Sequence, residues 1–159
     1  MIQSPRGEYE FVTFRVGMQW FGVPVMTVQE VLVVQRLARI PLAPPEVTGV
    51  LNLRGQLVTA INLHKLLDAG TRPEAAAMNV VVRDGDELFA MVVDEVGEVI
   101  TVAARSIEPL PATLDTCWRA ACEGVVRSPH GLLAVLEPGR LLDDSLNCHS
   151  TAIKPRSAV

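Results

Sequence analysis

The stretch Gly49-Val50-Leu51-Asn52-Leu53-Arg54-Gly55 joins two apolar segments and decides the fold, because it turns the chain back between them. Gly55 can adopt the positive φ that a tight turn requires. The side chain of Asn52 can bond backbone groups and close the same turn. With the apolar segment Leu57–Ile61 that follows, the stretch predicts a β-hairpin whose structural turn residues are Asn52 and Gly55.

Arg54 is needed for neither of these turn functions. A long planar cation beside an apolar surface usually pairs with a carboxylate or serves at an interface. Glu30 is the partner that we expect, because it too lies inside an apolar segment, Val28–Val31. If the pair is partly buried, removing one member costs about 3–5 kcal/mol. A surface arginine without a partner fits the spacing equally well.

The apolar pattern around this turn occurs twice in the chain. A shift of 75 positions (124 − 49) places Gly49 on Gly124 and the strand that starts at Leu57 on the one that starts at Leu132. A shift of 68 positions (89 − 21) matches the earlier parts, and a short insertion between Pro109 and Gly124 accounts for the difference. Each unit has about five short strands, which is typical of a small barrel. A chance match between two Val/Leu-rich segments is the alternative.

Composition limits the classes of protein and partner. Of the 159 residues, 49% are hydrophobic and 4% aromatic, so the core is mainly aliphatic and favours strands. The net charge of −4, without a Lys/Arg cluster, argues against nucleic acid and against an anionic membrane surface. No segment looks like a membrane span or a signal peptide, which indicates the cytoplasm. Three cysteines are expected to be reduced thiols: Cys117, Cys122 and Cys148.

A search for catalytic or metal-binding patterns finds no convincing set. The three histidines, His64, His130 and His149, have no metal-type spacing. The sequence contains neither a phosphate-binding loop nor a nucleophile elbow. Asp94 and Glu95 are adjacent after a strand, where neighbours point to opposite faces, so we expect a solvated turn. The sequence therefore predicts a protein without catalytic residues, metal or cofactor.

Three motifs in fixed order carry a resemblance to a known family. They are Val28-Gln29-Glu30-Val31, Gly49–Gly55 and Val92-Val93-Asp94-Glu95-Val96, and the matching elements extend from about Phe11 to Leu142. In these residues the chain resembles the CheW family, the coupling proteins of bacterial chemosensory arrays.

The resemblance implies an all-β fold of two SH3-like five-stranded β-barrels packed side by side, with a few short helical turns. We expect one CheW-like domain over residues 1–159. Its first barrel would cover about 9–70, a linker about 68–77 and its second barrel about 78–143. Residues 144–159 are expected to form a mobile tail.

The resemblance also implies a non-enzymatic scaffold without cofactors. Such a scaffold bridges the cytoplasmic tip of methyl-accepting chemoreceptors to the regulatory domain of the histidine kinase CheA. It would be cytoplasmic, associated with membrane-bound receptor arrays, with no nucleic acid bound and no insertion into the membrane.

The resemblance assigns two sets of contact residues. The receptor-binding set, between the two barrels, is Val28, Glu30, Arg54, Ala90 and Val99. The kinase-binding set, on the rim of the first barrel, is Leu42, Gly49, Val50 and Leu57. Ala90 stands where relatives frequently have glycine, so we expect an extra methyl group in the receptor groove. Thr59 and Asn62 depart from the Pro and Asp that are common in relatives.

Two alternatives remain open at this stage. One is a paralogue of the same family that serves another chemosensory pathway, in pilus motility or cyclic-dinucleotide control. The other is an enzyme built on a β-barrel, which fold alone does not exclude. No set of residues can be nominated for its active site.

Overall fold

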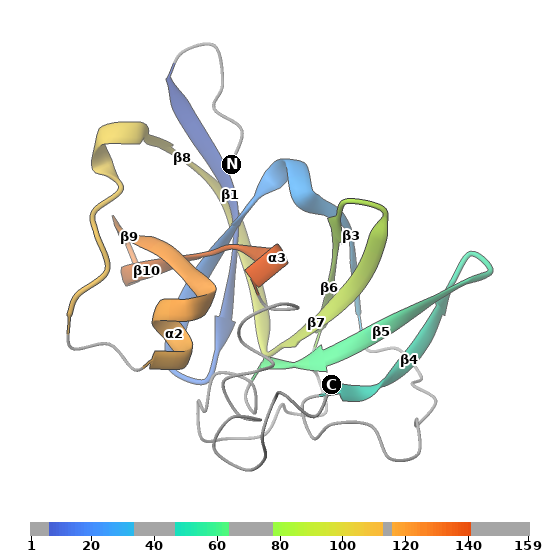
Figure 1. The fold of residues 1–159 in the computed structure, drawn as a ribbon. Coiled ribbons are helices and arrows are strands. Elements are labelled where there is room, and N and C mark those ends of the chain that lie inside the picture. The colour runs from blue at the N-terminus through green and yellow to red at the C-terminus, as the bar shows by residue number, and fades with distance from the viewer. Residues whose placement is uncertain (1–6, 34–46, 64–77, 113–115, 141–159) are drawn as a thin grey trace.

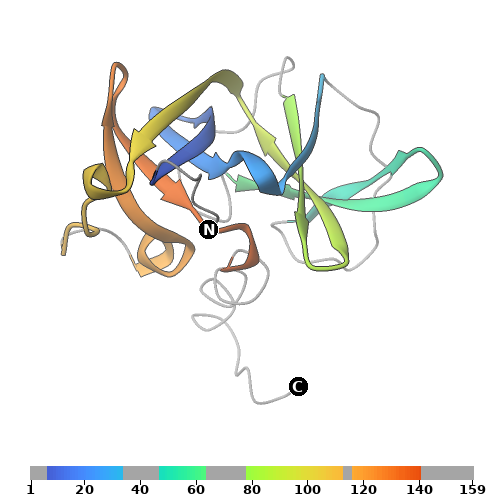
Figure 2. The same ribbon diagram turned by 90° about the horizontal axis from the view of Figure 1, so that it is seen from above.

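The computed structural model describes residues 7–33, 47–63, 78–112 and 116–140, and every structural statement below concerns these ranges. Their strands form two five-stranded sheets that lie side by side (Figures 1 and 2). Sheet A contains, in order, β8 (Glu95–Ala103), β1 (Glu8–Val16), β2 (Gln19–Pro24), β10 (Gly131–Leu136) and β9 (Cys122–Ser128). Sheet B contains β3 (Val28–Leu32), β6 (Met78–Asp84), β7 (Glu87–Val93), β5 (Gln56–Asn62) and β4 (Val47–Leu53).

Helical structure in the described residues is limited to short elements. They are η1 (Val25–Thr27), η2 (Ala104–Ser106), α2 (Thr116–Ala121) and α3 (Pro138–Arg140). The predicted fold class is confirmed: the chain is an all-β protein of two five-stranded, SH3-like subdomains with a few helical turns.

The sequence repeat is visible in the pairing of the strands. In the β1–β2 hairpin Phe14 pairs with Phe21, and in the β6–β7 hairpin Val82 pairs with Phe89. Both members of the second pair follow from the first by the same shift of 68 positions (82 − 14 and 89 − 21). The match predicted between the first strands of the two repeats is therefore confirmed to the residue.

The second pair of hairpins obeys the other shift. Leu53 pairs with Gln56 at the end of β4–β5, and Ser128 pairs with Gly131 at the end of β9–β10. Each hairpin closes with a two-residue loop, and the two are related by 75 positions (128 − 53 and 131 − 56). The turn at Arg54-Gly55 thus has a counterpart at Pro129-His130.

The two repeats exchange strands, which the sequence did not predict. β3 of the first repeat pairs with β6 of the second, and β8 of the second pairs with β1 of the first. The register is the same in both cases, since Val28 opposes Val82 just as Val96 opposes Phe14. The β4–β5 and β9–β10 hairpins are exchanged in the same way, through parallel pairs with β7 and β2.

This exchange corrects the predicted division of the chain. The prediction assigned the first barrel to residues of about 9–70 and the second to about 78–143. This assignment is wrong, because each sheet contains strands from both ranges. Alternating hydrophobicity shows which face of a strand is buried. It does not show which of two equivalent strands, one from each repeat, pairs with a given neighbour. The predicted linker, about 68–77, and tail, 144–159, lie outside the described residues.

Three hydrophobic clusters hold the sheets together. The largest joins the sheets and includes Phe14 and Phe21 from sheet A with Phe89 and Met91 from sheet B. The rings of Phe14 and Phe21 stack with centroids 5.6 Å apart. Two smaller clusters each fill one subdomain. One surrounds Phe11 in sheet A, and the other surrounds Val81 in sheet B. Along a strand, side chains therefore point alternately into the shared core and into the core of the subdomain itself.

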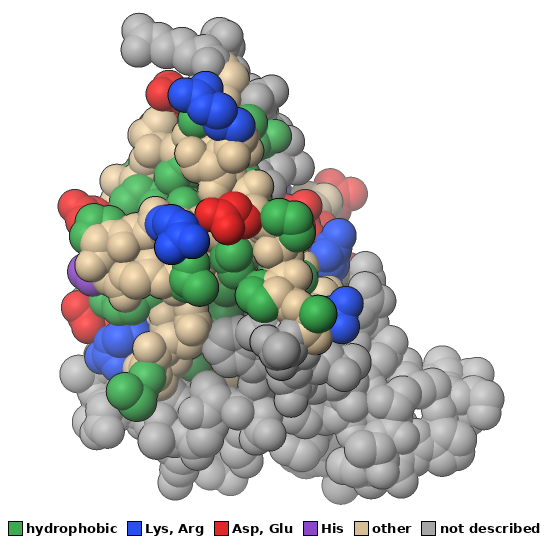
Figure 3. Space-filling view, turned by 90° about the vertical axis from the view of Figure 1, so that its left-hand side faces the viewer, with side chains coloured by type: hydrophobic (Ala, Val, Ile, Leu, Met, Phe, Trp, Pro, Cys, Tyr) green, Lys and Arg blue, Asp and Glu red, His purple; other side chains and the backbone are tan. Residues whose placement is uncertain are grey.

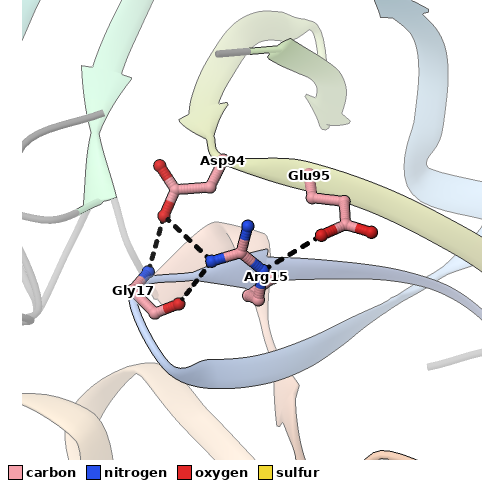
Figure 4. A network of polar contacts seen from close by, with 4 residues as sticks. All are labelled: Arg15, Gly17, Asp94 and Glu95. Atoms are coloured by element: carbon pink, nitrogen blue, oxygen red, sulfur yellow. Dashed lines mark hydrogen bonds and ion pairs between the residues drawn. The ribbon is translucent and has the colours of Figure 1, made fainter. Parts of the chain in front are cut away.

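A polar network fixes the point where the chain passes from β7 in sheet B to β8 in sheet A (Figure 4). Oδ2 of Asp94 accepts a hydrogen bond of 2.7 Å from the backbone N–H of Gly17, and the Asp94 N–H donates to the carbonyl of Arg15 at 2.9 Å. Nη1 of Arg15 donates to the Gly17 carbonyl at 2.7 Å, and its Nε lies 3.1 Å from Oε1 of Glu95.

The expectation of a solvated turn at Asp94-Glu95 is therefore wrong for Asp94, whose side chain is only 8% exposed. Asp94 lies in a bend between strands, so strand alternation does not separate it from Glu95. Both carboxylates reach the same guanidinium, that of Arg15.

Candidate partner-binding surfaces

The β4–β5 turn has the geometry predicted from its sequence. The N–H of Gly55 donates a hydrogen bond of 2.7 Å to Oδ1 of Asn52, and Gly55 has a φ of 87°. Arg54 also has a positive φ, 52°. Two successive positive φ angles are the pattern of a type I′ turn, which matches the twist of the flanking strands.

The backbone of Arg54 is strained for a residue of its type. Among the described residues, it is the only non-glycine with a positive φ. A side chain other than Gly, Asn or Asp in this region costs of order 1–3 kcal/mol. Asparagine would suit the position better, so folding alone gives no reason for arginine. At the counterpart turn the equivalent residue is Pro129.

Glu30 and Arg54 form the ion pair that the sequence suggested. Nη1 of Arg54 lies 2.7 Å from Oε1 of Glu30. The Arg54 side chain is 71% exposed and that of Glu30 is 23% exposed. The condition of partial burial is therefore not met at Arg54, and such a pair contributes about 0–1 kcal/mol. Its position at the surface, with donors still directed to solvent, suits it to contact a partner.

A β-bulge directs Glu30 toward this turn. The register between β3 and β6 shifts between Val28 and Glu30, so Gln29 is the extra residue. Bulges re-aim side chains locally. Val28 is half-buried against the shared core, and Glu30 is free to reach the β4–β5 hairpin.

Two other residues of the predicted receptor set, Ala90 and Val99, lie on other strands. Val99 is on β8 of sheet A, opposite Val12, and is 53% exposed. Ala90 is fully buried in the core of sheet B, beside Ala60 and Val81. The expectation that Ala90 adds a methyl group to a groove is therefore wrong.

Packing explains why alanine fits at position 90 where the equivalent position of the first repeat has glycine. The repeat equates Ala90 with Gly22 (90 − 68), where a Cβ atom would meet Cδ2 of Leu133 at 2.8 Å. The position equivalent to Leu133 in sheet B is Val58 (133 − 75), which is smaller. Sheet B therefore has room for the methyl group inside its own core.

The predicted kinase set lies on the β4–β5 hairpin where the structure describes it. Gly49 is buried, Val50 is half-buried and Leu57 is 71% exposed. Leu57 opposes Asn52, two residues along the strand from Val50, so Val50 and Leu57 share one face of the hairpin. Leu42 lies outside the described residues.

Groups with catalytic potential are few in the described part of the chain. Burial raises the pKa of the Cys122 thiol to about 12, so it is not a thiolate nucleophile at neutral pH. Within the same residues no group of His, Cys, Asp and Glu has the arrangement of a metal site. His130 stacks on Trp20 with ring centroids 4.2 Å apart.

The charged surface is mixed in sign. On the side that carries β8 and β9, arginine and acidic side chains alternate with hydrophobic ones (Figure 3). Among the described residues, no helix has the length and hydropathy needed to cross a bilayer. The fold and these surfaces define the class of protein: a double β-barrel module with exposed apolar and charged side chains.

Comparison with known proteins gives the family. The model of the CheW-like domain matches residues 10–146, so the chain belongs to the CheW family. It is 30% identical over 141 residues to a chemotaxis protein CheW of Treponema pallidum, covering 84% of this chain and 82% of the relative. Identity to a CheW of Rhizobium meliloti is 29% over 132 residues, which covers 82% and 85% of the two chains.

A solved structure supports the same assignment. The crystal structure of the scaffolding protein TtCheW from Thermoanaerobacter tengcongensis superposes with a TM-score of 0.74 at 28% identity, covering 81% of this chain and 88% of that one. The chain is thus a chemotaxis adaptor of the CheW family and not an enzyme.

Proposed function

We propose that this protein couples methyl-accepting chemoreceptors to the histidine kinase CheA by binding both at separate surfaces. The observation that carries the proposal is the ion pair between Glu30 and Arg54, formed by an exposed arginine on a strained turn. Membership of a family that couples receptors to CheA supports it. The protein would work in the cytoplasm, in arrays at the membrane that holds the receptors.

The receptor surface is formed by Val28, Glu30, Arg54 and Val99. An exposed valine and a half-buried one offer apolar contacts to the helical hairpin at the cytoplasmic tip of a receptor, in a helix-in-groove mode. The charges of Glu30 and Arg54 would fix the register of that helix rather than supply most of the affinity.

The kinase surface is the outer face of the β4–β5 hairpin, with Val50 and Leu57 at its centre and Gly49 next to Val50 along β4; Leu42 belongs to the proposed set on the resemblance alone. Leu57 is a large apolar side chain that is 71% exposed, which suits it to become buried at an interface. Its partner would be the regulatory domain of CheA.

The assignment of two surfaces is tested by measuring binding to each partner separately. Arg54→Asn should weaken binding of a receptor signalling fragment about tenfold, through loss of charged hydrogen bonds, and leave binding of the CheA regulatory domain unchanged. Leu57→Ser should weaken the kinase complex about tenfold and leave the receptor complex unchanged.

Two control variants match these substitutions. Arg127→Gln removes another exposed arginine that pairs with a glutamate, at 3.4 Å from Glu108. Met18→Ser removes a fully exposed apolar side chain from the β1–β2 turn. If the controls weaken either complex as much as the test variants do, the assignment of surfaces is wrong.

The pathway is tested by deleting the gene. Loss of swimming chemotaxis with pilus motility intact is the expected result. The reverse result would show a paralogue that serves another chemosensory system.

A further inference from the structure

A cavity of about 580 Å³ lies beside sheet A, where Pro109 and Leu110, the ends of α2 and α3 and the start of β9 meet. Its apolar wall includes Pro109, Leu110 and Ala120. Three charged side chains complete it: Arg119, Glu123 and Arg140. None of these residues belongs to the proposed receptor or kinase surfaces.

The cavity lies where the second repeat is longer than the first. Between the equivalent residues Pro109 and Gly124 the second repeat has fourteen residues, 110–123, whereas the first has seven between Pro41 and Gly49. The second repeat is thus seven residues longer in the segment that leads into this cavity.

Two of the charged groups are open to a partner, because Glu123 has a buried oxygen without a donor and Arg119 is exposed to solvent. Oε2 of Glu123 is buried and has no hydrogen-bond partner. Neither Glu123 nor Arg119 has an ion-pair partner among the described residues. Arg140 is already engaged, since its Nη1 donates to the backbone carbonyl of Cys122 at 3.1 Å.

A buried acceptor without a donor is costly, and a group placed there by a partner would remove the cost. The position equivalent to Glu123 is Thr48 (123 − 75), which is neutral, so the carboxylate is particular to this cavity. A carboxylate and a guanidinium that have no ion-pair partner among the described residues, on one cavity of mixed polarity, are complementary to a ligand that carries both charges.

We infer that this cavity binds a segment of a partner protein that presents a basic side chain next to an acidic one. The basic group donates to Oε2 of Glu123, and the carboxylate pairs with Arg119. The apolar wall at Leu110 contacts the aliphatic part of the basic side chain.

Blocked dipeptides test the inference without a chemoreceptor or a kinase. The probes are acetyl-Arg-Asp-amide, the single-charge forms acetyl-Arg-Asn-amide and acetyl-Gln-Asp-amide, and the neutral acetyl-Gln-Asn-amide. Each is titrated into the full ¹⁵N-labelled chain at millimolar concentrations. We expect saturable shifts of the amides of Leu110, Ala120 and Glu123 with acetyl-Arg-Asp-amide, and none with the neutral form.

Two variants separate the charges. Glu123→Gln should weaken both arginine-bearing probes about tenfold or more and leave acetyl-Gln-Asp-amide unchanged. Arg119→Gln should weaken the aspartate-bearing probes and leave acetyl-Arg-Asn-amide unchanged. Spectra of both variants without ligand show whether the fold is retained.

Three outcomes would overturn the inference. One is the absence of saturable shifts with every probe. Another is binding of acetyl-Gln-Asp-amide alone, which would define an anion site and remove the role of Glu123. The third is binding that neither variant changes, which would place the probes elsewhere on the surface.

Discussion

Arg54 is a residue whose type is poorly suited to its backbone. It occupies the first position of a two-residue turn at a φ of 52°, before Gly55 at 87°. Asn-Gly is the preferred sequence for such a turn. The arginine accepts strain there and places its guanidinium 2.7 Å from Glu30, which points to selection for contact rather than for stability.

The variant Arg54→Asn should therefore keep or increase stability. Asparagine tolerates the left-handed region, and the exposed ion pair that is lost contributes only about 0–1 kcal/mol. We expect the free energy of unfolding to be unchanged or to rise by up to about 1 kcal/mol, measured by urea denaturation. A fall of more than about 2 kcal/mol would mean that the arginine is needed for folding.

Cys122 is a residue that is inert because it is buried. Burial raises the pKa of its thiol from 9.0 to about 12, so the folded state retains a proton that the unfolded state loses above pH 9. Stability from this group is thus complete below pH 9 and is lost as the pH rises toward 12. Iodoacetamide should not modify Cys122 in the native protein at pH 8, as checked by peptide mass mapping. Rapid native modification would contradict the burial.

The predictable part of the site was the part governed by local rules. Asn52 and Gly55 follow from turn chemistry, and Glu30 follows from its place in an apolar strand. Ala90 was misplaced because its assignment to the receptor groove came from the resemblance alone, whereas the structure buries its side chain beside Ala60 and Val81. Asp94 was misread because a bend between strands suspends the alternation of side chains.

At the scale of elements, hairpins were predictable and their partners were not. The shifts of 68 and 75 positions hold to the residue in four hairpins, because each is closed by adjacent segments. The sequence could not predict that β3 and β8 exchange sheets, because equivalent strands of the two repeats have equivalent edges and faces.

The connection from β7 to β8 is fixed by Asp94. Replacing Asp94 by Ala leaves the Gly17 N–H without the acceptor it has at 2.7 Å. We expect the free energy of unfolding to fall by about 1–3 kcal/mol, measured by chemical denaturation. Glu95→Ala is the matched control: its side chain is 54% exposed, so its loss should cost less than about 1 kcal/mol. Equal effects of the two variants would contradict the role of Asp94.

At the scale of the whole molecule, the two subdomains share one core. The largest hydrophobic cluster takes residues from both sheets, and each repeat supplies strands to each sheet. Neither subdomain can therefore be completed by one half of the chain. The adaptor should behave as a single rigid body that holds its two proposed surfaces at a fixed separation.

Cooperative unfolding tests this unity. Met91 is fully buried in the shared core but belongs to sheet B, and Met91→Ala should destabilise the protein by about 2–5 kcal/mol. Native-state hydrogen exchange should accelerate as much in β1 and β2 of sheet A as in β6 and β7 of sheet B. Acceleration confined to sheet B would show that the subdomains unfold independently.

Coupling requires that one molecule of this protein connect a receptor to a kinase. The most direct measurement is CheA autophosphorylation in the presence of membranes that carry a chemoreceptor, with and without this protein. We expect receptor-dependent stimulation that requires the wild-type chain, is retained by Arg127→Gln and is lost in Arg54→Asn, whose fold is intact. Stimulation that is absent with the wild-type chain, or unchanged in Arg54→Asn, would contradict the proposed coupling and its receptor surface.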